Sequence, residues 1–471
     1  MTTREFDVIV IGAGAIGENV ADRTVQGGLR TAIVEAELVG GECSYWACMP
    51  SKALLRAGAV LRAARAVEGA SAAVTGALDP RGILARRDRI VHEWNDDSQV
   101  AWLNGAGIEL VRGHARLTGE RTVAVTAADG TVTELTARHA VAISTGSAAV
   151  LPEIPGLADA SPWTSREATS AKSVPERLAI IGGGVVAAEL ATAYVDLGST
   201  VTLLARSTLL SDQEPFAGDA VADALRARGA TVSLGTVPVS VSRDEAGVHL
   251  ELDDGSVLDV DEVIVATGRV ARTEDLGLEA VGLAPGDWLE VDDTLRVRDF
   301  DWLYGVGDVN HRALLTHQGK YQARAAGDVI VARATGADVD DAPWGRHVAT
   351  ADARVVPQVT FTDPEVASVG LTAAAAEQAG IRIRVVDYDL SWVAGATAQS
   401  DDYQGHARAV IDEDRQVLVG VTFVGPGVGE MLHAATIAIA AEVPLERLWH
   451  AVPAYPTVSE VWLRFLETYG R

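Results

Sequence analysis

The sequence predicts an α/β protein that contains two similar βαβ units and a C-terminal α+β region. An apolar run over residues 6–11 ends at a glycine turn, and a helical stretch and a second apolar run over residues 31–35 follow. The same order returns from residue 177, with glycines at 182–184 and an apolar run over residues 201–204. Strand, turn, helix and strand within about thirty residues form a βαβ unit.

The region after residue 345 has a different pattern. The segments at residues 359–364, 407–411 and 417–423 have the pattern of antiparallel strands. They alternate with helices that we expect around residues 372–380 and 429–442. This third observation predicts an α+β domain at the C-terminal end.

The length of 471 residues suggests about three domains. We expect one domain from residues 1–150 and 268–345, a second from residues 151–267 and a third from residues 346–471. Within the first, residues 107–150 predict short alternating strands that end in a Thr-Gly pair, and a near copy of this ending stands at residues 267–268.

The charge balance limits the partners. With 39 basic and 65 acidic residues, the net charge is −26 and the pI is about 4.7. Because phosphate binding needs clustered Lys and Arg, this argues against nucleic acid or an anionic membrane surface as a partner. The acidic residues are spread along the chain, which predicts a solubilising surface or, alternatively, adaptation to salt. No apolar stretch has the length of a membrane helix, and the N-terminus predicts a strand and turn instead of a signal peptide. Only two cysteines occur, which favours a reducing cytoplasm.

Gly12, Gly14 and Gly17 form a G-x-G-x-x-G pattern between a strand and a helix. The first glycine permits a tight turn, the second lets the backbone approach a pyrophosphate, and the third lets the helix pack on the strand. Unpaired N–H groups at the helix N-terminus favour the anion. Glu35 lies 35 − 12 = 23 residues after Gly12, at a strand end where a carboxylate binds a ribose hydroxyl. These residues predict a dinucleotide site, and a turn without a ligand is the alternative.

Gly182, Gly184 and Ala187 repeat the pattern in the second unit, with alanine at the packing position. The second strand of this unit ends in Arg206 instead of an acid. A guanidinium binds a 2′-phosphate through charge-assisted hydrogen bonds, whereas a carboxylate would repel it. The sequence therefore favours NADPH over NADH, and a solvated surface arginine is the alternative.

Cys43 and Cys48 follow the first βαβ unit directly. Cysteines five residues apart do not share a face of a regular helix, so a disulfide between them needs an irregular turn, which the glycines at 40–41 and Pro50 would suit. A helix N-terminus there would lower a thiol pKa, as redox chemistry requires. Two ligands cannot complete a structural zinc site, and a purely structural disulfide is unusual in the cytosol. A pair of inert buried thiols is the remaining alternative.

Several motifs together resemble the flavoprotein disulfide reductases, the class I pyridine nucleotide-disulfide reductases. They are the cysteine motif with its Pro-Ser-Lys, both glycine turns, the two Thr-Gly strand ends and the segment Tyr-Gly-Val-Gly-Asp that ends at Asp308. The family includes dihydrolipoamide dehydrogenase, glutathione reductase and mercuric reductase. The resemblance covers essentially the whole chain. It implies Rossmann-like domains for FAD and NAD(P)H, and a C-terminal dimerisation domain that forms a homodimer.

The resemblance also implies roles for individual residues. Cys48 would form the charge-transfer thiolate beside the flavin, and Cys43 would be the interchange thiol that attacks the acceptor. Lys52 would lie near the hydride-accepting nitrogen of the flavin, with Glu189 as its ion-pair partner. Asp308 would bind the ribityl chain. The implied FAD-binding residues are Gly12, Gly14, Gly17, Glu35, Lys52, Thr145, Gly146 and Asp308; the implied NADPH-binding residues are Gly182, Gly184, Ala187, Arg206 and Gly268.

The chain departs from the family near its C-terminal end. The family signature His-Pro-Thr-x-Ser-Glu supplies a histidine acid–base group, but here Tyr455 stands at that position, and Glu460 ends the motif. Tyrosine has a reference pKa near 10 against about 6.5 for histidine, and loss of such a base costs on the order of 10² to 10⁴ in rate. His450 is a candidate replacement, and a surface histidine is the alternative.

Mercuric reductases resemble this chain at Tyr455 and around Arg206, but their C-terminal cysteine pair has no counterpart after Cys48. Tyr45 and Trp46 are bulkier than the Leu-Asn usual in the family, which indicates either a differently shaped acceptor site or aromatic packing. We expect an NADPH oxidoreductase that reduces a small disulfide or another thiol-reactive acceptor, and we predict no metal site. The alternatives are a diaphorase that reduces a quinone or a metal ion, and a non-catalytic redox sensor or complex subunit.

Overall fold

A computed structural model describes residues 2–470 of the chain. The chain folds into two compact units. Unit 1 contains the residues up to Pro50, Asp88–Val150 and Gly268–Ala353. Unit 2 contains Ser51–Arg87, Leu151–Thr267 and the residues from Arg354 onward. The division into three domains stays a prediction.

Unit 1 contains a seven-stranded sheet in the order β3-β2-β1-β6-β5-β4, with β16 also paired to β6. Strands β1, β2, β3, β6 and β16 run parallel, while β4 and β5 form antiparallel pairs. A further strand pair, β7 and β15, is antiparallel. The strands are β1 (Thr2–Ile11), β2 (Thr31–Glu35), β3 (Glu109–Arg112), β4 (His114–Gly119), β5 (Thr122–Thr126), β6 (Val132–Ile143), β7 (Ser147–Ala149), β15 (Arg269–Ala271) and β16 (Leu303–Gly305).

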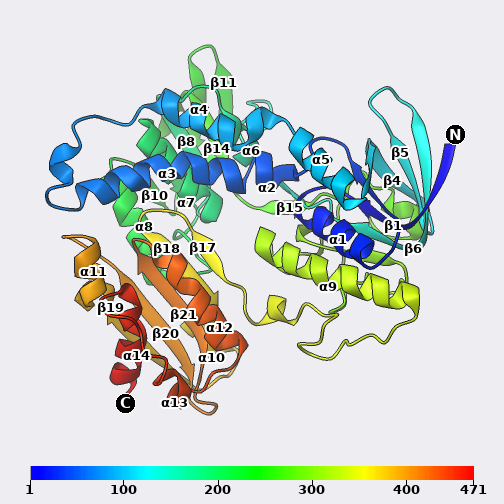
Figure 1. The fold of residues 1–471 in the computed structure, drawn as a ribbon. Helices are drawn as coiled ribbons and strands as arrows, with labels where there is room; N and C mark the ends of the chain where they lie inside the picture. The colour runs from blue at the N-terminus through cyan, green and yellow to red at the C-terminus, as the bar shows by residue number, and fades with distance from the viewer. Residues whose placement is uncertain (1, 471) are drawn as a thin grey trace. The chain divides into compact units, whose positions relative to one another are not determined.

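The helices of unit 1 cover the parallel part of this sheet, and α1 and α9 pack side by side (Figure 1). Val8 and Val10 of β1 pack with these two helices, whereas Ile9 and Ile11 pack in a second cluster on the other face. Burial on both faces explains why residues 8–11 of β1 form an unbroken apolar run. The helical segments are α1 (Ala15–Gln26), α2 (Gly41–Tyr45), η2 (His92–Trp94), α5 (Asp97–Ala106), η3 (Leu278–Val281), η4 (Asp308–Asn310), α9 (Thr316–Thr335) and η5 (Thr350–Ala353).

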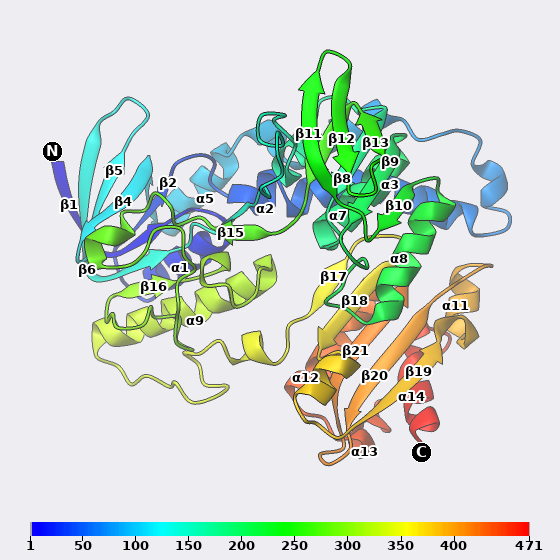
Figure 2. The same cartoon turned by 180° about the vertical axis from the view of Figure 1, so that it is seen from behind.

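The second βαβ unit forms a four-stranded parallel sheet in unit 2, in the order β10-β9-β8-β14. An antiparallel sheet of β11, β12 and β13 is inserted in the sequence between β10 and β14 (Figure 2). These strands are β8 (Arg177–Ile181), β9 (Thr200–Ala205), β10 (Thr231–Leu234), β11 (Pro238–Asp244), β12 (Gly247–Leu252), β13 (Val257–Val260) and β14 (Glu262–Val265).

The largest core of unit 2 forms where helices cover this parallel sheet. Leu54 of α3, Tyr194 of α7 and Val221 of α8 contribute buried side chains. Helices α3 and α4 each continue across a boundary between the units. The helical segments are α3 (Cys48–Arg65), η1 (Ser71–Ala73), α4 (Pro80–Ile90), α6 (Ser165–Ser170), α7 (Val185–Leu197) and α8 (Pro215–Ala227).

The C-terminal part of unit 2 is an antiparallel five-stranded sheet in the order β17-β18-β21-β20-β19. Helix α12 packs on β18 and β21, and α14 packs on β19. The elements are β17 (Gln358–Thr360), β18 (Glu365–Gly370), α10 (Ala373–Gln378), β19 (Ile383–Asp389), η6 (Leu390–Trp392), α11 (Ala394–Gln399), β20 (His406–Asp412), β21 (Val417–Gly425), η7 (Val428–Met431), α12 (Leu432–Ala440), α13 (Leu445–Leu448), η8 (Val458–Glu460) and α14 (Val461–Tyr469). The α/β fold class with its C-terminal α+β region is therefore confirmed.

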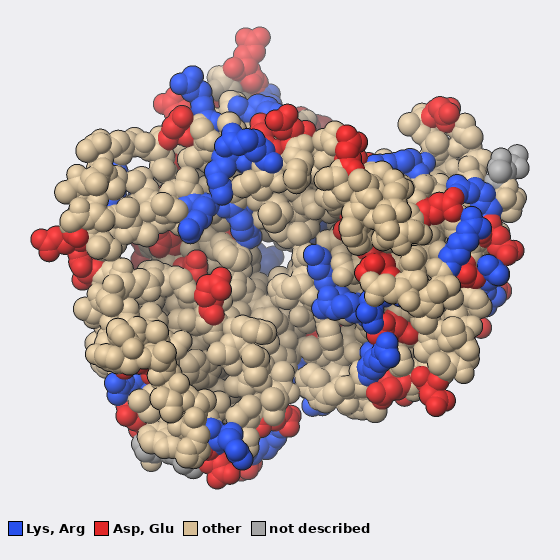
Figure 3. Space-filling model, viewed as in Figure 1, with Lys and Arg blue, Asp and Glu red and all other residues tan. Residues whose placement is uncertain are grey.

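Acidic and basic side chains are interspersed on the face shown in Figure 3, without a broad patch of positive charge. This agrees with the expectation that the charges are distributed along the chain. Among residues 2–470, no helix combines the length and the apolar composition that crossing a membrane requires.

Candidate active site

The first glycine turn has the geometry that its sequence predicts. A Cβ atom at Gly12 would lie 2.6 Å from the carbonyl oxygen of Ser144, and one at Gly17 would lie 1.9 Å from that of Gly12. At Gly14 the nearest atom would be 3.9 Å away, on Gly41. The first and third positions therefore need glycine for backbone packing. The second leaves open space at the N-terminus of α1, as an approaching pyrophosphate requires.

The residues around this turn also fit a bound dinucleotide. Glu35 accepts hydrogen bonds from the N–H groups of Ala13 (2.7 Å) and Glu37 (2.8 Å), and burial raises its pKa. The hydroxyl oxygens of Ser144 and Thr145 are buried without a hydrogen-bond partner among residues 2–470. Because buried polar atoms are normally paired, these orphaned hydroxyls indicate a ligand site.

Asp308 lies at the start of η4, in the same unit. Its carboxylate accepts a 2.6 Å hydrogen bond from the hydroxyl of Ser147 and lies 4.0 Å from Arg269. Burial raises the pKa of Asp308. A carboxylate held in this way keeps acceptor capacity for a ligand hydroxyl. Gly146 has a left-handed backbone at φ 74° directly before β7.

Cys43 and Cys48 lie on two consecutive helical segments of different length. Cys43 is in the five-residue α2, which starts at two left-handed glycines, Gly40 before it (φ 112°) and Gly41 as its first residue (φ 59°). Cys48 is the first residue of the 18-residue α3. The break between α2 and α3 provides the irregular turn that the sequence predicts. The Cys43 thiol hydrogen-bonds to Cys48, and no disulfide joins the two. This hydrogen bond, burial and the Cys48 charge raise the pKa of Cys43.

Two groups that sequence reasoning missed lie next to this pair. The Thr316 hydroxyl, on the first residue of α9, is 3.3 Å from the Cys48 sulfur. Glu42 accepts hydrogen bonds from Arg269 (3.1 Å) and Arg272 (2.8 Å), which fixes the residue before Cys43 to β15 and the segment after it. No sequence motif marks these contacts, because they join segments more than 200 residues apart.

Lys52 and Glu189 form an ion pair in unit 2. The Lys52 Nζ lies 2.7 Å from Glu189 Oε2, and the other carboxylate oxygen accepts the N–H of Phe361 at 3.0 Å. The Lys52 ammonium also lies 4.7 Å from the centre of the Phe361 ring. The Glu189 side chain is only 5% exposed, so the pair compensates a charge that would otherwise be costly to bury.

The second glycine turn repeats the first. A Cβ atom at Gly182 would lie 2.3 Å from the carbonyl oxygen of Ala266, whereas one at Gly184 would have no atom within 4 Å among residues 2–470. Ala187 is fully buried in α7. Arg206 follows β9, is exposed, and takes part in no ion pair within the described chain. The open second position and the available guanidinium fit an NADPH site.

Gly268 lies directly before β15 and belongs to unit 1, whereas the glycine turn at Gly182 belongs to unit 2. It has a backbone φ of 143°. Its assignment to the NADPH site stays a prediction, as do the roles of the other predicted site residues.

The C-terminal motif places its two ends in different environments. The Tyr455 side chain is 76% exposed, and His450 is also exposed. Glu460 is 6% exposed; its Oε1 lies 3.5 Å from Arg464, and its Oε2 has no hydrogen-bond partner among residues 2–470. The motif therefore offers an exposed phenol and a buried carboxylate with unused acceptor capacity.

Tyr45 and Trp46 are part of a buried aromatic cluster. Tyr45 is fully buried, and Trp46 is 9% exposed. Their rings pack 5.6 Å apart beside Val91 and Trp94. Of the two interpretations of these residues, the structure favours aromatic packing.

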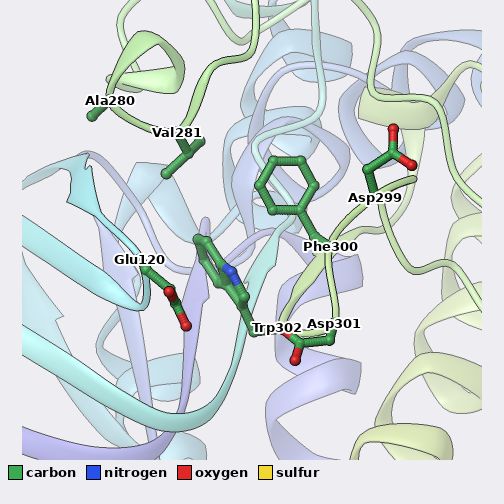
Figure 4. Close-up of a pocket in the computed structure, with 7 residues that line it drawn as sticks. All are labelled: Glu120, Ala280, Val281, Asp299, Phe300, Asp301 and Trp302. Atoms are coloured by element: carbon green, nitrogen blue, oxygen red, sulfur yellow. The ribbon is translucent and has the colours of Figure 1, made fainter.

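One open cavity of about 510 Å³ lies elsewhere in unit 1 (Figure 4). Trp302 and Phe300 contribute two aromatic rings to its lining, and the others are Glu120, Ala280, Val281, Asp299 and Asp301. None of the predicted site residues lines it. No group of three His, Cys, Asp or Glu side chains among residues 2–470 is arranged to hold a metal ion.

The fold, with its paired glycine turns and its cysteine segment, is that of the flavoprotein disulfide reductases. The chain belongs to the pyridine nucleotide-disulphide oxidoreductase family: the family profile matches residues 6–330, and the profile of its dimerisation domain matches residues 356–464. Members of this family are enzymes that use FAD and NAD(P)H. The predicted family, enzyme class and cofactor types are confirmed.

Two relatives show the range of the family. The chain is 33% identical to a mercuric reductase of Shigella flexneri over 474 residues, which cover 98% of this chain and 81% of the relative. It is 28% identical to a dihydrolipoyl dehydrogenase of Chlamydia muridarum over 471 residues, which cover 97% of this chain and 95% of the relative.

Solved structures with the same fold cover the whole chain. The Cu(II) complex of the HOCl-induced flavoprotein disulfide reductase RclA from Escherichia coli has a TM-score of 0.85 at 23% identity, covering 98% of this chain and 99% of that chain. LpdA from Mycobacterium tuberculosis has a TM-score of 0.83 at 23% identity, with both chains covered completely.

Proposed function

We propose that this protein transfers electrons from NADPH, through a bound FAD and the Cys43–Cys48 pair, to a small disulfide or another thiol-reactive acceptor. The hydrogen-bonded thiols of Cys43 and Cys48, beside a turn shaped for a dinucleotide, carry the proposal. A pair of inert buried thiols would not require the break between α2 and α3 that brings Cys43 and Cys48 together.

The residues of unit 1 fit FAD and those of unit 2 fit NADPH. Gly14 leaves space for the FAD pyrophosphate, while Glu35 and Asp308 offer carboxylates to its hydroxyls. Gly184 and Arg206 would bind the pyrophosphate and 2′-phosphate of NADPH. When bound, FAD supplies the electron transfer from nicotinamide to sulfur that no side chain can perform.

The cysteines carry the second half of the reaction. Two-electron reduction breaks the S–S bond and takes up one proton, which leaves one thiol and one thiolate in the pair. We assign the thiol to Cys43 and the thiolate to Cys48, in line with the raised pKa of Cys43. Cys43 then loses its proton and attacks the acceptor, and Cys48 closes the disulfide again as the acceptor leaves in reduced form. Tyr455 replaces the usual histidine base, so the acceptor need not be the one that relatives with histidine reduce.

We propose a homodimer for the working enzyme. The match of residues 356–464 to the dimerisation domain supports it. In this arrangement residues 1–150 and 268–345 bind FAD, residues 151–267 bind NADPH, and residues 346–471 form the interface. Sedimentation of the purified protein tests the dimer, which a stable monomer at micromolar concentration would exclude.

A metal ion as the substrate is the second candidate. The similarity to mercuric reductase and the fold shared with RclA, which was solved as a Cu(II) complex, favour it. The sequence contains no cysteine beyond Cys48, so such an ion would be reduced without a second cysteine pair.

An anaerobic NADPH titration tests the proposal. The flavin and the disulfide each accept one electron pair, so wild type should consume roughly two equivalents per subunit, and Cys43→Ser roughly one. The variant should lose turnover of disulfide acceptors by about 10³-fold or more. Equal consumption by both proteins would exclude the cysteine pathway. Full metal-ion or quinone turnover by Cys43→Ser would identify a diaphorase, and negligible NADPH oxidation with every acceptor would favour the redox-sensor alternative.

A further inference from the structure

A buried chain of hydrogen bonds connects helix α9 to the segment that contains Asp308. Gln322 of α9 is fully buried. Its amide oxygen accepts the backbone N–H of Gly307 at 2.8 Å and the side-chain amide of Asn310 at 2.8 Å. Its amide nitrogen donates to a carboxylate oxygen of Asp352 at 2.9 Å. Gln322 therefore links the residues on both sides of Asp308 to Asp352.

Asp352 lies in η5 and belongs to unit 1, although it follows residues 268–345, the range predicted to complete the FAD domain. Its side chain is 1% exposed. One carboxylate oxygen accepts the amide of Gln318 at 2.9 Å. The other oxygen accepts the amide of Gln322 and lies 3.4 Å from the guanidinium of Arg312. Both oxygens of this buried carboxylate are thus engaged by side chains of unit 1.

The carboxylate of Asp352 fixes the orientation of the Gln322 amide. The backbone N–H of Gly307 can only donate, so the amide oxygen of Gln322 has to face Gly307 and the nitrogen has to face Asp352. A carboxylate suits two such nitrogens, from Gln318 and Gln322, because it only accepts hydrogen bonds. An asparagine at position 352 would offer one acceptor and one donor group, so one of the two glutamines would face a donor. A buried donor without an acceptor is costly, so the carboxylate favours the arrangement in which Gln322 holds Gly307.

Gly307 lies where the first glycine turn and α9 approach each other. Its backbone is left-handed at φ 86°, and a Cβ atom on it would lie 3.1 Å from the side chain of Ile16. Ile16 belongs to the turn at residues 12–17, and a Cβ atom on Gly319 of α9 would lie 2.5 Å from the same side chain. Asp308 is the next residue after Gly307, and the proposed function assigns its carboxylate to a hydroxyl of FAD. A shift of the Gly307 backbone would therefore move Asp308 relative to the pyrophosphate turn.

We propose that Asp352 is a positioning residue for the FAD site. Through Gln322 it holds the backbone of Gly307, so that the carboxylate of Asp308 meets the hydroxyls of FAD. The inference rests on the proposed function, because it concerns the role given there to Asp308. It adds a residue that no sequence motif marks, since the two hydrogen bonds of the chain span 15 and 30 residues.

The charge of Asp352 makes this link depend on pH. Burial raises the pKa of Asp352 to about 6, while Arg312 and the hydrogen bonds from the two glutamines lower it. The other titratable groups that interact with Asp352 are Asp293, which raises the same pKa, and Tyr321. Above pH 6 the carboxylate accepts from both glutamines, and below pH 6 one of its oxygens carries a proton and no longer suits a donor. Wild type at low pH should therefore hold Gly307 no better than Asp352→Asn does.

The test is the affinity of the protein for FAD, measured by ultrafiltration and flavin fluorescence after dilution of the holoenzyme. At pH 8, Asp352→Asn should raise the dissociation constant of FAD by roughly 10-fold, as expected when a buried donor loses its acceptor. At pH 5 the variant and wild type should agree within about twofold. Other carboxylates of the site titrate in both proteins, so they do not affect the ratio. Asp293→Asn removes an exposed carboxylate that lies 2.9 Å from Arg312, and it should leave the dissociation constant unchanged.

A double-mutant cycle shows whether Asp352 acts through Asp308. Asp308→Ala alone should weaken FAD binding, and Asp352→Asn added to it should change the dissociation constant by less than about twofold. A purely structural role of Asp352 would give the same factor in both backgrounds and at both pH values, which would overturn the inference. Wild-type affinity in Asp352→Asn, together with weak binding in Asp308→Ala, would remove the inference alone. If Asp308→Ala binds FAD as wild type does, the role of Asp308 in the proposed function fails, and the inference fails with it.

Gln322→Met provides a second route to the answer if Asp352→Asn does not fold. It removes the link between Asp352 and Gly307, so it should raise the dissociation constant of FAD by about 10-fold or more when Asp308 is present. When Asp308 is replaced by alanine, the same change should have an effect of less than about twofold. Circular dichroism confirms the fold of each variant. An equal factor in the two backgrounds would contradict the role of the link and overturn the inference.

Discussion

Residues 12–17 and residues 182–187 form the same turn between a parallel strand and a helix, but their surroundings differ. In both turns a Cβ atom on the first glycine would collide with a backbone carbonyl, and the second glycine borders open space. The two turns differ at the third position of the motif. Gly17 allows no Cβ, since one would lie 1.9 Å from the carbonyl oxygen of Gly12, whereas Ala187 is accommodated in α7.

The ends of the second strands differ in charge and in bonding. Glu35 is held by the N–H groups of Ala13 and Glu37, so its carboxylate is fixed before any nucleotide binds. Arg206 is exposed and takes part in no ion pair within residues 2–470. A preorganised acceptor suits a cofactor that stays bound, and an exposed cation suits a nucleotide that exchanges in each turnover. In the proposed function, the first turn would bind the resident cofactor and the second turn the exchanging nucleotide.

The helices after the turns each carry one acidic residue near the site. Glu189 of α7 is paired with Lys52 at 2.7 Å, whereas Glu18 of α1 has no ion pair within 4 Å in the described chain. Burial raises the pKa of Glu18 to about 7. A direct cationic partner therefore accompanies one buried carboxylate and not the other.

Substitution of the residue at the third turn position should have the largest effect and should distinguish the two turns most clearly. Gly17→Ala forces a Cβ against the Gly12 carbonyl, so we expect a loss of roughly 4 kcal/mol or more and little bound FAD. Ala187→Gly, the reverse change in the second turn, should cost about 1 kcal/mol. Denaturant unfolding and the flavin content of the purified variants measure both effects. Equal losses for the two variants would show that the turns are not packed differently.

The unpaired acid should make stability depend on pH. Because the folded-state pKa of Glu18 is raised from 4.5 to about 7, its contribution to stability is fully present below about pH 4.5 and is lost as the pH rises through 7. Glu18→Gln mimics the protonated form. The variant should exceed wild type by up to about 3 kcal/mol at pH 8 and match it near pH 4.5. Unfolding at fixed FAD concentration tests this, and a difference independent of pH would contradict it.

Arg206 should decide between the two nicotinamide nucleotides. Arg206→Ala removes the charge for the 2′-phosphate, so the ratio of kcat/KM for NADPH to that for NADH should fall by about 10- to 100-fold. Arg226→Ala, at a partly exposed arginine of α8, is the matched control and should leave the ratio unchanged. If Arg206→Ala leaves the ratio intact, NADPH selection lies elsewhere.

The Lys52–Glu189 pair should show a modest coupling. A double-mutant cycle with Lys52→Met and Glu189→Gln should give roughly 1 kcal/mol, because Lys52 is 36% exposed and water screens the pair. The same cycle on the exposed pair Arg226 and Asp223 should give a few tenths of a kcal/mol. A coupling energy for Lys52 and Glu189 that is no larger than that for Arg226 and Asp223 would contradict this expectation. It would show that the cationic partner of Glu189 gives it no stabilisation that Glu18 lacks.

Local sequence patterns were sufficient for the fold class and for much of the candidate site. Glycine spacing predicts both turns because only the backbone conformation and the close approach of neighbouring carbonyls matter there. The glycines and the proline of the cysteine segment predict an irregular turn because they restrict or free the local backbone. Gly40 and Gly41 are indeed left-handed, at the start of the segment. Apolar runs predict the C-terminal strands, although the run at residues 359–364 yields only the short β17.

Contacts between distant segments could not be predicted in this way. Thr316 reaches Cys48 across 268 residues, and Arg272 reaches Glu42 across 230 residues. The aromatic residues between the cysteines left two interpretations open, and only their burial beside Val91 and Trp94 favours packing.

The sequence by itself determined the two βαβ units, the C-terminal α+β region and the redox cysteine motif, because each depends on the spacing of residues close together in the chain. The tertiary structure decided which charges surround those motifs. Thr316 comes to the cysteine pair on helix α9, and the pKa of a thiol depends on such neighbours in space. Electrostatic environment is a property of packing, and no local pattern encodes it.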